Sequence, residues 1–390
     1  MHPSKIVFSN GDLISLNPTN REEVGRVKVT DIEDIPAMID RARVAQREWG
    51  KLSVRERGKH LLPLADYVYD HQDEFIDIIA RECGKPRVEA VTSELFPLAA
   101  HVNYLAGQAP KILADEMIPQ FWMTAAFGKR GRIVQEPLGV IAVLSPWNYP
   151  LWTLAGPVFS ALVAGNAVIA KPSEYTPVTA DLLRRAVEAI GLPKDLFQMA
   201  HGDGRVGSAL VSGPVNKIVF VGSTNTGRKV MASAAANLTA VTMELGGNDA
   251  AIVLEDADLD NAARGIAWGG FTCSGQVCAS IERVFVVESV YADFIQRLAY
   301  HTMDLRVGIE LEAVEVGSMN NERQFDIVER QVNEAVEQGA RVVTGGKGDG
   351  MVFKPTILAD VPARAEILHR ETFGPVLPVE KVNDGEQAVQ

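Results

Sequence analysis

The sequence predicts an α/β protein with parallel sheets, divided into two domains. Continuously apolar runs at residues 139–144, 167–170 and 218–221 are typical of strands buried on both faces. Helical patterns separate these runs, and strands that alternate with helices favour a parallel sheet. The length of 390 residues exceeds what one hydrophobic core usually accommodates, which favours two domains.

Composition and charge narrow the class of protein. The net charge of −12 disfavours a nucleic-acid-binding surface as the main function. The apolar runs are too short for a membrane span, and the first residues do not resemble a signal peptide. Cys83, Cys273 and Cys278 form neither a C-x-x-C pair nor a zinc-ligand cluster. We therefore expect a cytoplasmic protein with no nucleic-acid or membrane partner and no metal.

The first hundred residues are expected to form helices. Thr30 with Glu33, and Ser53 with Glu56, have the spacing of capping boxes. Each pair precedes apolar residues at helical intervals. From about Arg132 onward the pattern changes to that of the alternating strands and helices.

A second α/β set follows Gly246 and Gly247, which are the expected junction between the domains. The patterns predict strands at 250–254 and 284–287, and helices at 259–268, 292–305 and 325–338. Residues 384–390 match the first turn of a helix. That turn is either a frayed tail or the start of a segment that the sequence does not include.

Gly222-Ser223-Thr224-Asn225-Thr226-Gly227 lies between a predicted strand and a predicted helix. Backbone N–H groups at a helix N-terminus favour a phosphate or pyrophosphate, and glycine allows the ligand to approach closely. The segment matches neither G-x-G-x-x-G nor a P-loop. A tight turn without a ligand is an equal alternative.

Lys171-Pro172-Ser173-Glu174 follows a predicted strand, at the edge where open α/β sheets bind ligands. A carboxylate there can accept hydrogen bonds from two ribose hydroxyls and would repel a 2′-phosphate. Solvated surface side chains are the alternative interpretation.

Cys273 and Cys278 are both candidates for a nucleophile. A cysteine is more often an inert buried residue. However, a turn containing Gly275 would place backbone donors near sulfur, as a thiolate requires. Position alone does not choose between the two.

Glu244 and Asn148 are two further candidates at predicted strand ends. A partly desolvated Glu244 can act as a base for water, and the amide of Asn148 can donate to an oxyanion. The alternatives are a solvent-facing glutamate and a rigid turn between Pro146 and Pro150.

Six motifs occur in one order, at residues 146–150, 171–174, 222–227, 244–248, 276–278 and 371–376. The series resembles the aldehyde dehydrogenase superfamily from near Asn17 to the last residue. Trp49 and residues 136–140 agree with this resemblance.

The resemblance implies a role for each catalytic candidate. Cys278, the cysteine of G-Q-x-C, is then the nucleophile, and Cys273 is its neighbour. Asn148 and the Cys278 backbone N–H would hold the oxyanion. Glu244 would activate the water that hydrolyses the thioester, which favours a free acid over a coenzyme A product.

The resemblance also implies NAD as the cofactor. Lys171 and Glu174 correspond to adenosine-ribose contacts, Ser223 to the pyrophosphate site, and Glu371 with Phe373 to the nicotinamide ribose. Glu174 favours NAD over NADP by charge repulsion. The full set of expected cofactor residues is Trp147, Lys171, Ser173, Glu174, Gly222, Ser223, Gly227, Leu245, Gly246, Glu371 and Phe373.

The fold implied by the resemblance has two Rossmann-like parallel α/β domains and a small β arm for oligomerisation. The expected ranges are 1–116 and 135–245 for the NAD-binding domain, 117–134 for the arm and 246–390 for the catalytic domain. Family chains continue beyond the position of Gln390, so the catalytic domain is expected to lack its C-terminal part. A homodimer or homotetramer is expected.

Two alternative functions remain open at this point. One is a semialdehyde dehydrogenase of the same superfamily, for which Arg283 is a possible contact to a second carboxylate. The other is a catalytically inactive or truncated member that acts as a binding or structural protein.

Overall fold

The computed structural model describes residues 4–119, 123 and 127–390, which form two compact units. Unit 1 comprises residues 1–26, 76–91 and 245–390, and unit 2 comprises residues 27–75 and 92–244. The change of unit between Glu244 and Leu245 lies next to the expected glycine junction. Residues 4–26 and 76–91 pack with the C-terminal unit, whereas the expected ranges placed them in the first domain.

Unit 2 contains a five-stranded sheet in the order β10-β9-β6-β7-β8. The strands are β6 Val140–Leu144, β7 Ala167–Lys171, β8 Phe197–Met199, β9 Lys217–Gly222 and β10 Ala240–Leu245. β6 pairs in parallel with β7 and β9, and β7 pairs in parallel with β8. Every residue of β6 and β7 is buried, as the apolar runs predict.

Helices cover this sheet because their apolar stripes need a partner surface. α1 Ile35–Trp49 and α8 Trp152–Val163 both contact β6 and β7, and the buried Trp49 indole donates to the Leu162 carbonyl at 2.7 Å. Among the described residues, the unit also contains α2 Val54–Leu61, α3 Pro63–Asp70, α6 Phe96–Ile112, α9 Pro177–Ala189, α10 Gly204–Ser212 and α11 Thr224–Ala236. α4 Gln72–Cys83 begins in unit 2 and ends in unit 1.

The two predicted capping boxes have different outcomes. Ser53 and Glu56 form the box at the start of α2, with both reciprocal hydrogen bonds present. Thr30 is not a cap: Asp31 accepts the Glu33 N–H and caps a short 3-10 turn that precedes α1. An aspartate one residue later replaces the threonine because its carboxylate reaches the same orphan N–H groups.

The prediction of helices from the first residue is wrong for the N-terminal segment. β1 Ile6–Ser9, β2 Asp12–Leu16 and β3 Glu23–Lys28 form a small sheet. β1 and β2 are an antiparallel hairpin in which Ser9 pairs with Asp12, and Asn10 and Gly11 both have positive φ. Asn-Gly in a two-residue loop is a strong hairpin signal in the sequence.

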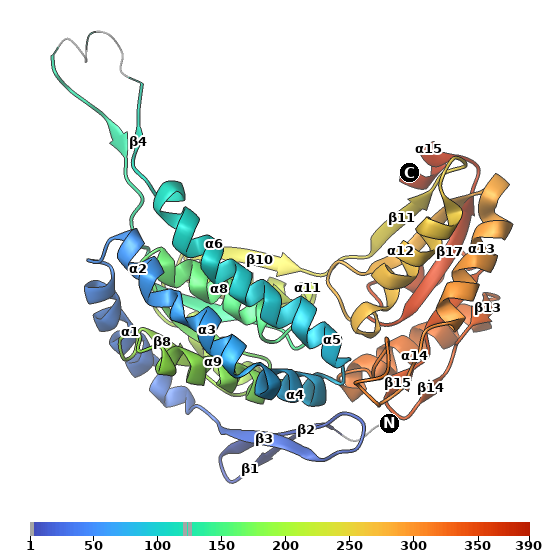
Figure 1. Ribbon diagram of the computed structural model, residues 1–390, viewed down its shortest axis with the longest axis horizontal. Coiled ribbons are helices and arrows are strands. Elements are labelled where there is room, and N and C mark those ends of the chain that lie inside the picture. The colour runs from blue at the N-terminus through green and yellow to red at the C-terminus, as the bar shows by residue number, and fades with distance from the viewer. Residues whose placement is uncertain (1–3, 120–122, 124–126) are drawn as a thin grey trace. The chain divides into compact units, whose positions relative to one another are not determined.

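The expected arm begins and ends in a short antiparallel pair. β4 Glu116–Met117 pairs with β5 Arg132–Ile133 and extends beyond the end of α6 (Figure 1). Residues 120–122 and 124–126 of the predicted range 117–134 lie outside the described residues.

Unit 1 contains the second five-stranded sheet, in the order β11-β12-β17-β16-β13. The strands are β11 Asp249–Val253, β12 Ile281–Val287, β13 Arg341–Thr344, β16 Thr356–Ala359 and β17 Val376–Val382. β11, β12, β17 and β16 pair in parallel, but β13 is antiparallel to β16. The short connection through the hairpin β14 Gly348–Asp349 and β15 Val352–Phe353 explains the antiparallel edge strand.

The predicted helices of this unit are present as α12 Leu259–Phe271, α13 Glu288–Met303 and α14 Glu322–Glu337. Phe271, Phe294 and Leu298 pack with Val284 and Val286 in one core. A second core lies around Phe325 and Phe353. The described residues contain no helix that is both long enough and apolar enough to cross a membrane.

Candidate active site

In unit 2 the predicted motifs gather at one edge of the sheet. Residues 146–150 follow β6, Lys171 ends β7, and Gly222 ends β9. Because these strands are parallel, their carboxyl ends share an edge. The chain order reverses between β6 and β9, and ligands of open α/β sheets bind at such a switch point.

Lys171 and Glu174 form a local ion pair at this edge. Lys171 is buried, and its Nζ lies 3.0 Å from Oε2 of Glu174. Ser173 is also buried, and its Oγ accepts the Tyr175 N–H at 3.3 Å. The Glu174 side chain is 27% exposed, so its carboxylate remains accessible from solvent.

Ser223 is the N-cap of α11. Gly222 has a φ of +157°, and a Cβ there would lie 2.9 Å from the ring of Phe220. The Ser223 hydroxyl accepts the Thr226 N–H, and both residues are exposed, whereas Gly227 is buried. The predicted strand-turn-helix arrangement is therefore present, and it leaves the start of α11 open to a ligand.

Asn148 lies buried in the turn between β6 and α8, and Trp147 beside it is partly exposed. A glutamate outside the sequence motifs binds the N-terminus of α8. The fully buried Glu94 accepts the Leu151 N–H at 2.8 Å. Glu94 is distant in sequence from residues 146–150, and no local signal indicates this contact.

In unit 1 the motifs lie at the opposite ends of the strands. Residues 246–248 precede β11, Cys278 precedes β12, and residues 371–375 precede β17. Since β11, β12 and β17 are adjacent and parallel, their amino ends lie at one edge.

The segment before Cys278 has an unusual backbone. Cys273, Ser274 and Gly275 have φ values of 53°, 55° and 70°, all in the left-handed region. The Cys273 N–H donates to Glu89 at 2.9 Å, and the Gln276 amide donates to the Cys273 carbonyl at 2.9 Å. In this segment Cys273 is buried and Cys278 is exposed. The two cysteines therefore differ in accessibility, which their positions in the sequence did not predict.

Two turns of unit 1 touch at Gly275. A Cβ on Gly275 would lie 2.1 Å from the carbonyl oxygen of Gly374. Only glycine permits this approach, so the turn that leads to Cys278 packs directly against the turn that carries Glu371.

Glu371 lies against the glycine junction. A Cβ on Gly246 would be 1.8 Å from Oε1 of Glu371, so the carboxylate occupies the space that any larger residue would need. Burial, and to a lesser extent the charge of Asp249, raises the pKa of Glu371 above its usual value. Phe373, two residues later, has a φ of 51°.

Arg283 has a structural contact. Its Nε and Nη2 donate to the Asn248 carbonyl at 3.0 and 2.6 Å, which ties β12 to the segment before β11. A contact from Arg283 to a substrate carboxylate would have to compete with this pairing.

Glu244 is exposed at the end of β10, and Leu245 is 38% exposed. Glu244, Asn148, Lys171, Glu174 and Ser223 belong to unit 2, whereas Cys278, Gly246, Glu371 and Phe373 belong to unit 1.

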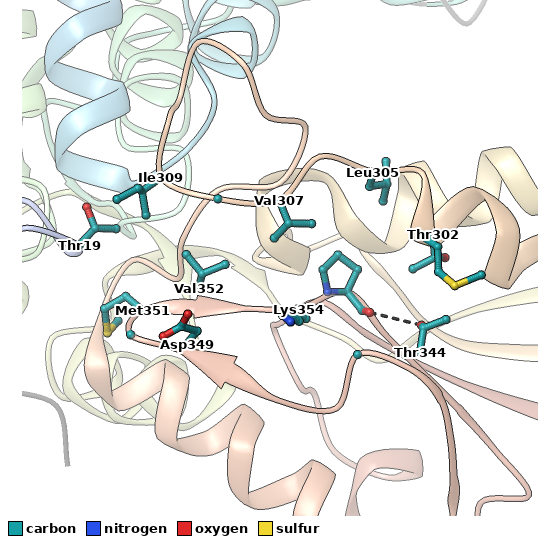
Figure 2. A pocket seen from close by; sticks show the side chains of 15 residues that line it. Thr19, Thr302, Leu305, Val307, Ile309, Thr344, Asp349, Met351, Val352 and Lys354 are labelled. Carbon is teal, nitrogen blue, oxygen red and sulfur yellow. Dashed lines mark hydrogen bonds between the residues drawn. The ribbon is translucent and has the colours of Figure 1, made fainter.

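A pocket of about 670 Å³ lies elsewhere in unit 1 (Figure 2). Residues of the 302–309 segment, the β14–β15 hairpin and Thr19 line it, and none of the predicted site residues does. Within the described ranges, no cluster of three or more histidine, cysteine or acidic side chains is arranged to hold a metal ion.

Comparison with known proteins identifies the family. A sequence profile of the aldehyde dehydrogenase family matches residues 8–390. Lactaldehyde dehydrogenase of Escherichia coli K12 is 36% identical over 381 residues, which are 96% of this chain and 78% of that protein. The NADP(+) succinate-semialdehyde dehydrogenase of the same organism is 35% identical over 383 residues, 96% of this chain and 78% of its own length.

Solved structures agree in fold. The crystal structure of a Mycobacterium tuberculosis aldehyde dehydrogenase complexed with NAD+ superimposes with a TM-score of 0.93 at 30% identity. The match covers 98% of this chain and 80% of that one. An Escherichia coli NADP-dependent enzyme gives a TM-score of 0.92 at 33% identity, over 99% of this chain and 79% of that chain.

The chain has the α/β aldehyde dehydrogenase fold and belongs to the aldehyde dehydrogenase family. It is thus a member of a family of oxidoreductases whose relatives include both NAD and NADP proteins.

Proposed function

We propose that this chain is a hydrolytic, NAD-dependent aldehyde dehydrogenase that oxidises an aldehyde to a carboxylic acid through a thioester on Cys278. The observation that carries the proposal is the contrast between the two neighbouring cysteines. The turn at residues 273–275 buries Cys273, whereas Cys278, three residues before β12, is exposed. An accessible thiol next to a glycine-containing turn suits a nucleophile.

The first step is attack of the Cys278 thiolate on the aldehyde carbon. The C–S bond forms as the carbonyl π electrons move to oxygen. The amide of Asn148 and the Cys278 backbone N–H would stabilise that oxyanion, and preorganised donors of this kind contribute about 3 kcal/mol each. The burial of Asn148 supports a fixed orientation of its amide.

The features of unit 2 fit a dinucleotide. Lys171 and Glu174 would contact the adenosine ribose, with Ser173 and Trp147 beside them. The turn from Gly222 to Gly227, with Ser223, would bind the pyrophosphate at the N-terminus of α11. In unit 1, Glu371, Phe373, Gly246 and Leu245 would contact the nicotinamide end. When bound, NAD supplies the hydride acceptor that converts the tetrahedral adduct to the thioester.

The carboxylate of Glu174 favours NAD. Its accessible oxygen can accept a ribose hydroxyl, whereas a 2′-phosphate in the same place would meet a like charge. The relatives include both NAD and NADP proteins, so membership of the family does not determine the cofactor. The proposed preference for NAD therefore rests on Glu174.

Glu244 would activate the water that hydrolyses the thioester. Water adds to the acyl carbon as its proton passes to the Glu244 carboxylate, and the Cys278 thiolate leaves with the C–S electron pair. The products are a free carboxylic acid and, once Glu244 has released the proton to solvent, the regenerated enzyme.

A semialdehyde dehydrogenase is the second candidate, because relatives named for succinate and glutarate semialdehyde are 35% identical to this chain. The engagement of Arg283 with Asn248 argues against that residue as the carboxylate contact. We further propose a cytoplasmic homodimer or homotetramer in which the β4–β5 arm takes part in assembly. The inactive binding or structural protein is the outcome if no aldehyde is oxidised.

The test is NADH formation by the purified chain across aliphatic, aromatic and semialdehyde substrates, with NAD and with NADP. The proposal expects turnover that depends on an aldehyde and on NAD and that yields one acid per NADH. A folded protein that binds NAD but oxidises none of these aldehydes would contradict it.

A further inference from the structure

Glu282 is a buried acid outside every motif that the sequence singled out. It lies on β12, four residues after Cys278, and only 3% of its surface is exposed. Its Oε2 accepts the Thr372 N–H at 2.7 Å, and its Oε1 accepts the Phe373 N–H at 2.8 Å. One carboxylate thus binds two consecutive backbone donors of the turn before β17.

The turn at residues 371–374 needs such an acceptor. Phe373 is a bulky residue in the left-handed region, with a φ of 51°, and this conformation is costly without support. Successive N–H groups in such turns converge on one anion. Thr372 is fully buried, so solvent does not readily replace the carboxylate as a partner.

The turn also determines where Glu371 is. Its carboxylate fits into the space above Gly246, where a Cβ would be 1.8 Å away. A change in the turn at Thr372 and Phe373 would move the neighbouring Glu371 out of this narrow space.

We propose that Glu282 is a positioning residue, which fixes the turn so that Glu371 presents its carboxylate to the nicotinamide ribose. The inference rests on the role of Glu371 in the proposed function.

The ionisation of Glu282 should make cofactor binding depend on pH. Burial raises the pKa of Glu282 to about 7, against the lowering effect of the two backbone N–H groups. The charged groups that face it, Glu371 and Asp249, are acids and raise its pKa further. Protonation turns one carboxylate oxygen into a hydroxyl, which is a donor and a much weaker acceptor, so the hydrogen bond from one of the two N–H groups weakens. Cofactor binding should therefore weaken as the pH falls through about 7.

The test is an equilibrium titration of the unmodified chain with NADH, followed by protein fluorescence, from one pH unit below to one unit above this value. We expect the dissociation constant to be about fivefold higher at the acidic end, because the loss of one hydrogen bond to a charged group weakens binding about tenfold and about a tenth of the chains stay ionised there. Glu282→Gln should bind NADH about tenfold more weakly at the alkaline end and show no dependence on pH in this range. A flat profile for the unmodified chain, or an unchanged profile for Glu282→Gln, would overturn the inference.

Asp249→Asn is the matched control. It removes a charge that raises the pKa of Glu282 but leaves the Thr372 and Phe373 contacts intact, so the midpoint should move to lower pH. If the melting temperature shows that Glu282→Gln does not fold, the comparison of the unmodified chain with Asp249→Asn still tests the inference. An equal pH midpoint of NADH binding in these two proteins would contradict the role of Glu282.

The binding experiment is separate from the test of function. Aldehyde oxidation through Cys278 with a flat NADH profile would refute the positioning role alone. The expected NADH profile without oxidation of any aldehyde would refute the proposed reaction alone.

Discussion

The two sheets present their motif residues at opposite ends of their parallel strands. In unit 2 the residues follow the strands β6, β7 and β9, and the turn after β9 leads into α11, which its own Ser223 caps. In unit 1 they precede the strands β11, β12 and β17, on turns with left-handed residues.

The turn after β9 differs from the turns of unit 1 in how it obtains backbone hydrogen bonds, whereas the turn after β6 resembles them because the remote, buried Glu94 accepts the Leu151 N–H. After β9 the hydrogen bond is local, because the Ser223 hydroxyl at the N-cap of α11 accepts the Thr226 N–H. In unit 1 the acceptors are buried glutamates from remote parts of the chain: Glu89 binds the N–H of Cys273, and Glu282 binds those of Thr372 and Phe373. The unit 1 turns therefore depend on tertiary contacts, and single substitutions far from the motifs can disturb them.

The largest effect on aldehyde oxidation is expected from substitution of Cys278, which follows the left-handed turn at residues 273–275. Cys278→Ala should abolish aldehyde oxidation and leave NADH binding unchanged, because it removes the nucleophile and no cofactor contact. Cys273→Ala is the matched control: the thiol is buried, so most activity should remain. Steady-state rates and NADH titrations measure both, and the reverse result would move the nucleophile to Cys273.

Glu244→Gln should separate the two halves of the reaction. Loss of a general base typically slows a step about 100-fold or more. Thioester hydrolysis should therefore slow while the first turnover stays fast, which produces a burst of NADH in stopped-flow absorbance. Equal slowing of both steps would contradict the assignment of Glu244 to water activation.

This contrast also explains what could be predicted from sequence. The strands and helices followed from apolar periodicity, and the site edge of unit 2 followed from the order of strand, turn and helix. The antiparallel β13 and the N-terminal hairpin were missed, although Asn10-Gly11 carried a signal. The contacts of Glu89, Glu94 and Glu282 were not predictable, because each joins segments that are remote in sequence and because a lone glutamate has no pattern.

A smaller effect is expected on stability as a function of pH. Between pH 4.5, the ordinary pKa, and about 7, Glu282 holds a proton in the folded chain but not in the unfolded chain. The unfolded state then binds fewer protons, so the stability due to this group falls as the pH rises through that interval and levels off above it. The change amounts to about 3 kcal/mol.

Denaturant unfolding of the unmodified chain and Glu282→Gln across this range isolates the effect, because the other acids contribute equally to both. The difference in unfolding free energy should change by about 3 kcal/mol, in favour of Glu282→Gln as the pH rises. If the difference in unfolding free energy stays constant, Glu282 is ionised across the whole pH range. A change in NADH affinity near neutral pH would then have to come from the titration of another group.

The smallest effect tests the unit 2 edge alone. Glu174→Gln removes the charge beside the adenosine ribose but keeps the size of the side chain and an acceptor oxygen. The ratio of kcat/KM for NAD to that for NADP should fall about tenfold, because the like-charge repulsion of the 2′-phosphate is lost while the ribose hydrogen bond persists. Lys171 is buried and loses the charge of its partner, so the melting temperature should fall as well. An unchanged cofactor ratio would show that the preference is set by other residues, and the strand-end carboxylate would then be a partner of Lys171 rather than a contact to the cofactor.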